Sequence, residues 1–125
     1  MKATLNQLHH QAIDWERELN FYKDELKILN GRLAEVVSKN TQREVLAQAE
    51  HFQNKFIILS EQISVMQHEL NLRNDNINKL VSESPEHIDE RISVIRGGML
   101  SQFKGLANSI ADTRFEFNEY LSKVM

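Results

Sequence analysis

The 125-residue chain contains no cysteine, and it contains only one proline and four glycines. Without cysteine it has no disulfide bond, no thiolate nucleophile and no cysteine-ligated zinc site. The missing thiols fit a reducing compartment, so we expect a cytoplasmic protein. Since Pro and Gly are so few, no linker between two domains is indicated and long helices are favoured. We expect one domain over residues 1–125.

The sequence also lacks a long apolar run and an excess of positive charge. No stretch approaches the roughly 20 apolar residues that a membrane-spanning helix requires, and the N-terminal sequence MKATLNQLHHQAIDW becomes polar too early for a secretion signal. The 15 basic residues are outnumbered by 18 acidic ones and are mixed with them along the chain. A nucleic-acid binder usually needs a basic face to displace counterions. We therefore expect neither a nucleic-acid partner nor membrane insertion.

Three ladders of apolar residues occupy nearly the whole chain, with steps that alternate between three and four residues. This spacing is typical of helices that pack along a coiled-coil seam. The first ladder continues for five heptads, the second ends in a more polar segment, and the third runs from Ile88 to Val124. The first two consist of Leu5, Leu8, Ala12, Trp15, Leu19, Tyr22, Leu26, Leu29, Leu33 and Val36, and of Val45, Ala49, Phe52, Phe56, Leu59, Ile63, Met66, Leu70, Arg73, Ile77 and Leu80.

Capping patterns separate the ladders. Thr4 with Gln7, and Thr41 with Glu44, have the spacing of a capping box, in which the hydroxyl accepts a backbone N–H and the longer side chain reaches back. The only proline, Pro85, follows Ser84 and suits the first position of a third helix. These signals predict two short turns between three helices.

The predicted helices cover about residues 5–37, 42–81 and 85–124, and each would be about 50 to 60 Å long. Short connections force neighbouring helices to run antiparallel. We therefore predict an all-α fold, an up-down-up antiparallel three-helix bundle of long coiled-coil-like helices. Its shape resembles that of spectrin-like repeats in architecture alone, because no sequence signature assigns the chain to that family.

The third ladder is less regular than the others. Two successive steps of four, from Ile95 to Met99 and on to Phe103, form a stutter beside Gly97 and Gly98. Paired glycines favour a kink, whereas the ladder crosses them undisturbed. We expect a continuous helix.

A second set of apolar residues lies outside the seams. With the ladders at heptad positions a and d, all five members of this set fall at position c, about 130° from the seam centre, and should face solvent. Phe21 and Ile28 form a partial row on the first helix, and the other three residues form one on the second. The hairpin of these two helices could bring the two rows near one another, and another helix would then cover them. Alternatively, the chain is a monomer in which long side chains such as Lys55 and Gln62 cover these positions. The five residues are Phe21, Ile28, Ile58, Val65 and Leu72.

Within the seams, Arg73 and Thr113 are polar exceptions. Arg73 follows Glu69 by four residues near the end of its helix. Its long stem can pack while its head reaches water, and we prefer this interpretation to a ligand contact. A polar seam residue can also fix the register or the oligomeric state of a bundle.

The sequence contains no recognisable catalytic motif. The weak metal-binding alternative combines His9, His10, Asp14 and His68, but His10 and His68 fall at position f, which points away from the seam. There is no Glu-x-x-His pair of the kind that di-iron bundles use. We therefore expect no cofactor and no enzyme, but a structural or protein-interaction module that forms a homodimer or binds a helical protein partner. The alternative is a helical bundle that binds a metal or a small ligand.

Overall fold

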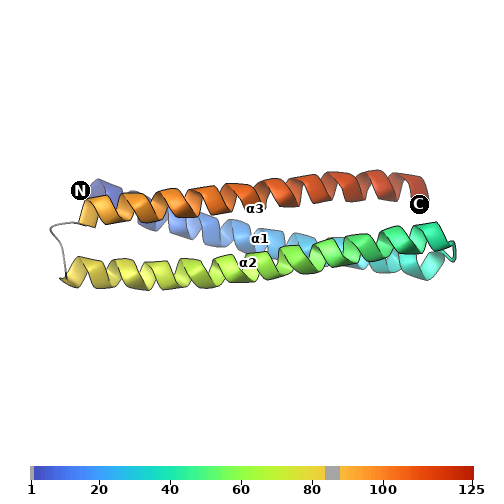
Figure 1. The fold of residues 1–125 in the computed structure, drawn as a ribbon, viewed down its shortest axis with the longest axis horizontal. Coiled ribbons are helices and arrows are strands. Elements are labelled where there is room, and N and C mark those ends of the chain that lie inside the picture. The colour runs from blue at the N-terminus through green and yellow to red at the C-terminus, as the bar shows by residue number, and fades with distance from the viewer. Residues whose placement is uncertain (1, 84–87) are drawn as a thin grey trace.

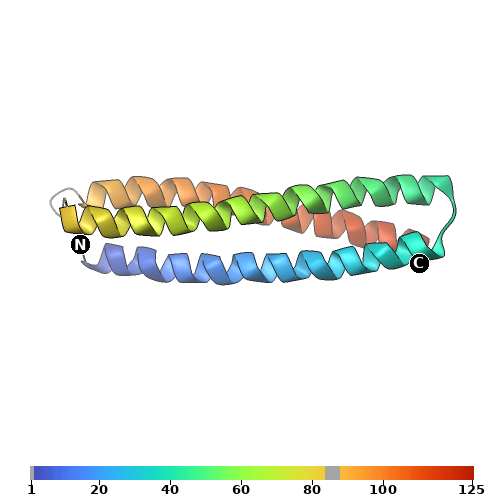
Figure 2. The same ribbon diagram turned by 90° about the horizontal axis from the view of Figure 1, so that it is seen from below.

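The computed structural model describes residues 2–83 and 88–125, and within them the side chains of residues 10–75, 79 and 97–125. It contains three helices, α1 (Lys2–Lys39), α2 (Arg43–Glu83) and α3 (Ile88–Val124). The helices lie side by side as a rod in which α1 and α3 run in one direction and α2 runs in the other (Figures 1 and 2). The predicted all-α, up-down-up three-helix bundle is confirmed. The beginning of α1 and the end of α3 lie at opposite ends of the rod (Figure 1).

The helix boundaries differ from the predicted ones at both ends of α1. The helix begins at Lys2, so Thr4 lies inside its first turn and the predicted cap at Thr4 is wrong. A helix start does not need a side-chain cap where water can satisfy its first N–H groups. At the other end α1 continues to Lys39, because the side-chain amide of Asn40 donates a 2.9 Å hydrogen bond to the Val36 carbonyl.

The start of α2 also differs slightly from the predicted one. The start of α2 at Arg43 is one residue later than predicted, and the Gln42 carbonyl accepts a hydrogen bond from the Leu46 N–H, 3.1 Å away. The predicted N-terminal signals of α3, Ser84 and Pro85, lie outside the described residues.

The core follows the three seams. Leu19, Val36 and Phe117 have no exposed surface, and Phe56, Ile63 and Ile110 are only 1 % exposed. Among the described side chains, Thr113 is the polar residue buried with them, at 6 % exposure. Of the described apolar seam residues, Tyr22, Val45 and Val124 are partly buried, and the others are buried.

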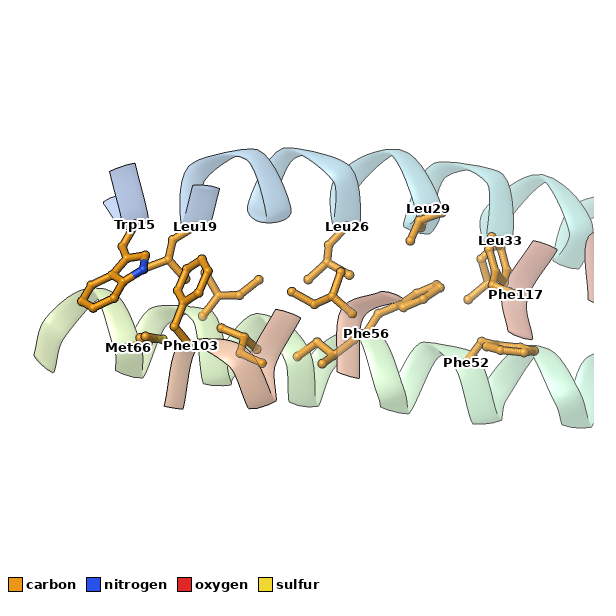
Figure 3. Packing of buried hydrophobic residues seen from close by; sticks show 14 of the residues in the cluster. Trp15, Leu19, Leu26, Leu29, Leu33, Phe52, Phe56, Met66, Phe103 and Phe117 are labelled. Atoms are coloured by element: carbon orange, nitrogen blue, oxygen red, sulfur yellow. The ribbon is translucent and has the colours of Figure 1, made fainter. Parts of the chain in front are cut away.

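Aromatic rings fill two regions of this core (Figure 3). Near one end, Trp15 stacks on Phe103 with a centroid distance of 5.7 Å and an interplanar angle of 25°. Near the turn between α1 and α2, the ring of Phe117 contacts Phe52 and Phe56 edge to face, with centroid distances of 5.3 and 5.1 Å. Such aromatic pairs contribute about 0.5–1.5 kcal/mol beyond their burial. The four seam aromatics Trp15, Tyr22, Phe52 and Phe56 are therefore packing residues.

The paired glycines do not interrupt α3, which is continuous from Ile88 to Val124 as predicted. A Cβ atom built on Gly98 would lie 3.6 Å from Nη1 of Arg73. The half-buried Arg73 therefore extends from α2 across to the backbone of α3. An alanine in place of Gly98 would make an ordinary van der Waals contact with this guanidinium group.

Candidate interaction surface

The five residues predicted at position c are all exposed. Their exposed fractions are 61 % for Phe21, 64 % for Ile28, 52 % for Ile58, 56 % for Val65 and 49 % for Leu72. Neighbouring side chains therefore do not cover them, in contrast to the monomer alternative. Lys55, to which the monomer alternative assigns part of this cover, instead donates a 2.7 Å hydrogen bond to Glu116 on α3.

Contacts between the helices show which side of α1 faces each neighbour. Asn20, at position b, accepts a 3.0 Å hydrogen bond from the side-chain amide of Gln67 on α2. Glu25, at position g, forms an ion pair with Arg114 on α3. Since positions c and g lie on one side of a helix and positions b and e on the other, Phe21 and Ile28 lie on the α3 side of α1.

Two contacts likewise show which side of α2 faces each neighbour. Lys55 is at position g and pairs with Glu116 of α3, whereas Gln67 is at position e and contacts α1. The c row of α2 (Ile58, Val65 and Leu72) therefore also lies on the α3 side. The two rows border α3 from opposite sides and form two separate faces, so the expectation that they lie near one another is wrong. The reason is that α1 and α2 turn their b and e sides toward each other.

The face between α2 and α3 is hollowed into a groove with a volume of about 630 Å³. Ile58 and Val65 line the α2 side, while Ser101, Gly105 and Ser109 line the α3 side at intervals of four residues. Residues at this interval share one face of a helix. Because their side chains are short or absent, the surface of α3 lies low beside the apolar side chains of α2.

The groove is open above Gly105. A Cβ atom built on this glycine would meet no other heavy atom within 4 Å. The buried side chains of Met66 and Leu106 also line the groove, which gives it an apolar base. Buried core residues thus form the bottom of the groove between the α2 and α3 rows.

The charges that line the groove are all negative. Glu61 and Glu69 are the ionisable residues of its lining, and the other polar side chains there are neutral amides and hydroxyls. Glu69 is partly buried and Glu61 is exposed. A basic group in the groove would therefore be attracted by two carboxylates, of which Glu69 also has Arg73 four residues further along the same helix.

The face between α1 and α3 has a different charge pattern. On α1, exposed Arg17, Glu18, Asp24 and Arg32 surround Phe21 and Ile28, so charges of both signs flank the apolar row. Tyr22 donates a 3.1 Å hydrogen bond to Glu18 at the edge of this face. This face can match a surface that carries alternating charge.

Sequence reasoning missed two features of the molecular surface. Phe115, on the outer surface of α3, is 68 % exposed and lies outside the predicted rows. The small residues of the groove were visible in the sequence at four-residue intervals. Their role depends on which side of α3 meets α2, and the seam pattern alone does not provide this information.

The weak metal-binding alternative gains no support from the described residues. His10, Asp14 and His68 are exposed, and the described part of the chain contains no group of three or more His, Asp and Glu side chains that could hold a metal ion. His9 belongs to the residues whose side chains the structure does not describe. The structure thus does not gather His10, Asp14 and His68 into a site.

The perturbed pKa values belong to contacts that hold the bundle together. Burial raises the pKa of the Tyr120 phenol, and burial together with the nearby Glu18 raises that of Tyr22. The hydrogen bond and the charge of Lys55 lower the pKa of Glu116. These shifts arise from packing and pairing between and along the helices.

Over the residues that the structure describes, none of the helices has a segment apolar enough and long enough to cross a membrane. Comparison with known proteins adds no relative. No protein-family model matches the chain, and no curated protein or solved structure matches it.

Proposed function

We propose that this protein is a non-enzymatic helical interaction module that self-associates into a homodimer through the face between α1 and α3. One observation carries the proposal. The apolar residues that the heptad pattern places outside the seams remain 49–64 % exposed, in rows with a spacing of seven residues. Rows of large exposed apolar side chains at a constant heptad position are typical of surfaces that another helix covers. The lack of cysteine suits a cytoplasmic location for this module.

The α1–α3 face is better suited to self-association than the groove. In a two-fold dimer each surface meets its own copy, so charges of both signs allow acidic and basic residues to pair across the interface. Burial of Phe21 and Ile28 contributes roughly 1.5–3 kcal/mol for each fully buried side chain. Because two copies contribute, four large side chains become buried in one dimer.

Light scattering on size-fractionated protein tests the homodimer. The unmodified chain should have twice the monomer mass of 14.6 kDa, and the variant Phe21→Glu with Ile28→Glu should have the monomer mass. A matched variant, Ile58→Glu with Val65→Glu, changes the other face and should remain dimeric. Helicity by circular dichroism should be unchanged in both variants. A monomeric mass for the unmodified protein at high concentration contradicts the proposal.

A further inference from the structure

We propose that the groove between α2 and α3 binds a basic amphipathic helix of a partner protein. This inference rests on the proposed function in one respect, namely that the exposed apolar residues bind helices. It concerns the face that the homodimer leaves uncovered.

The shape of the groove fits a helix. Ile58 and Val65 are separated by two helical turns, or about 10 Å. An amphipathic helix presents apolar side chains at intervals of three, four and seven residues, which can pack on either side of these two residues. Helix axes approach to 8–10 Å depending on the side chains at the contact, and the row of Ser101, Gly105 and Ser109 permits a close approach on the α3 side.

The charge of the groove determines the kind of helix. Glu61 and Glu69 lie eight residues apart on α2, about 12 Å along its axis, and the groove lining contains no basic residue. Lysine or arginine side chains that flank the apolar stripe of a bound helix would lie within reach of both carboxylates. An acidic helix would meet repulsion there, and like charges across an interface disfavour the wrong partner.

The same charges disfavour a second copy of this chain as the occupant. Two grooves facing each other would bring together Glu61 and Glu69 of both copies without a basic residue from either lining. The other exposed row, with Phe21 and Ile28, is flanked by Glu18 and Asp24 as well as by arginines, so it offers no net positive charge. A partner with a basic helix matches the groove better than any surface described for this chain.

Fluorescence anisotropy with a synthetic helix tests the proposal. The ligand is a labelled peptide of about 18 residues with leucines along one face and lysines beside them, and a matched peptide carries glutamate in place of each lysine. The basic peptide should bind with a dissociation constant in the micromolar range, and the acidic peptide should bind at least about tenfold more weakly. Added salt should reduce this difference, because it screens the charges at the rim.

Gly105 offers a way to close the groove. Since a Cβ atom there meets nothing within 4 Å, Gly105→Trp should fill the groove without displacing the core, and should weaken binding of the basic peptide at least about tenfold. Gly31→Trp is the matched control, because Gly31 is exposed on α1 and also has open space around it. This control should bind the peptide like the unmodified protein.

A charge reversal provides a second test that does not depend on a bulky residue. The double variant Glu61→Lys with Glu69→Lys should prefer the acidic peptide to the basic one, with thermal melts confirming that the fold is retained. Equal binding of both peptides to the unmodified protein overturns the proposal, as does unchanged binding by Gly105→Trp. If Gly105→Trp instead lowers the mass of the protein in light scattering, a second copy occupies the groove and the proposal is wrong.

The two proposals can fail separately. Loss of the dimer in the Phe21→Glu, Ile28→Glu variant is measured by mass, whereas peptide binding is measured by anisotropy. A monomeric protein that still binds the basic peptide would contradict the homodimer and support the groove. A dimer that binds neither peptide would support the homodimer and contradict the groove proposal.

Discussion

The phenol of Tyr120 on α3 donates a 2.7 Å hydrogen bond to the backbone carbonyl of Val45 in α2. Its ring also packs against Phe52, with a centroid distance of 5.1 Å. This residue therefore fixes the end of α3 against the beginning of α2 through both a polar contact and an apolar one.

Removal of this hydroxyl should weaken the bundle measurably. Tyr120→Phe keeps the ring in the core and deletes the bond to Val45, so the free energy of unfolding should fall by about 0.5–1.5 kcal/mol. Urea denaturation followed by the fluorescence of the buried Trp15 provides the measurement. Tyr22→Phe is the control, since its exposed hydrogen bond joins residues of the same helix and should contribute less.

Stability should fall at high pH. Burial raises the pKa of Tyr120 above its ordinary value of 10.0, so the folded protein holds this proton more tightly than the unfolded chain does. The contribution is fully present below the unfolded pKa and is lost as the pH rises through the raised pKa of the folded state. The pKa of Tyr22 is raised as well, so its contribution to stability is also lost at high pH.

A series of thermal melts from about pH 8 to pH 11 would measure this loss. Tyr120→Phe should show a smaller decrease in Tm above about pH 10 than the unmodified protein, because one of the two contributing tyrosines is gone. Parallel curves for the two proteins would contradict the prediction.

Alanine in place of Gly97 should stabilise the protein. Gly97 lies inside a continuous helix, and an added Cβ meets nothing within 4 Å, so the lower backbone entropy of alanine should contribute about 0.5–1 kcal/mol. At Gly98 the same change places a Cβ 3.6 Å from Nη1 of Arg73, which is an ordinary van der Waals contact, so a gain of similar size is expected. Chemical denaturation of both variants gives the comparison. A loss of stability in Gly97→Ala would contradict a continuous α3.

Two phenylalanines that are two residues apart on α3 should behave very differently. Phe117 has no exposed surface, and Phe117→Ala should cost about 3–5 kcal/mol of unfolding free energy through lost burial and a cavity. Phe115 is 68 % exposed, so Phe115→Ala should change stability by no more than about 0.5 kcal/mol. Similar losses of unfolding free energy in both variants would show that Phe115 is covered by a second chain. Light scattering on each variant would test this by measuring its mass.

The seam pattern predicted the architecture well because burial of apolar residues dominates the packing of long helices. Leu19, Phe56 and Ile63, which were predicted as seam residues, are at most 1 % exposed. The cap at Thr4 failed because a capping signal contributes only about 1 kcal/mol, and water can satisfy the first N–H groups of a helix that begins elsewhere.

The arrangement of the two exposed rows was harder to predict. A heptad position gives the angle of Phe21 or Ile58 from the seam of its own helix, but does not state which neighbouring helix lies on that side. Three-helix bundles of either handedness satisfy the same ladders. The pairs Glu25–Arg114 and Lys55–Glu116 distinguish them, because they connect specific flanks of α1 and α2 to α3.

The opposite placement of the two chain ends has a mechanical consequence. Three antiparallel passes carry the backbone from one end of the rod to the other, over the length of a helix of nearly 40 residues, or about 55 Å. Tension applied between the ends of α1 and α3 therefore acts along the helix axes and loads all the layers of the seam in shear. An even number of passes would return the chain to its starting end, and the same tension would peel the layers apart one by one.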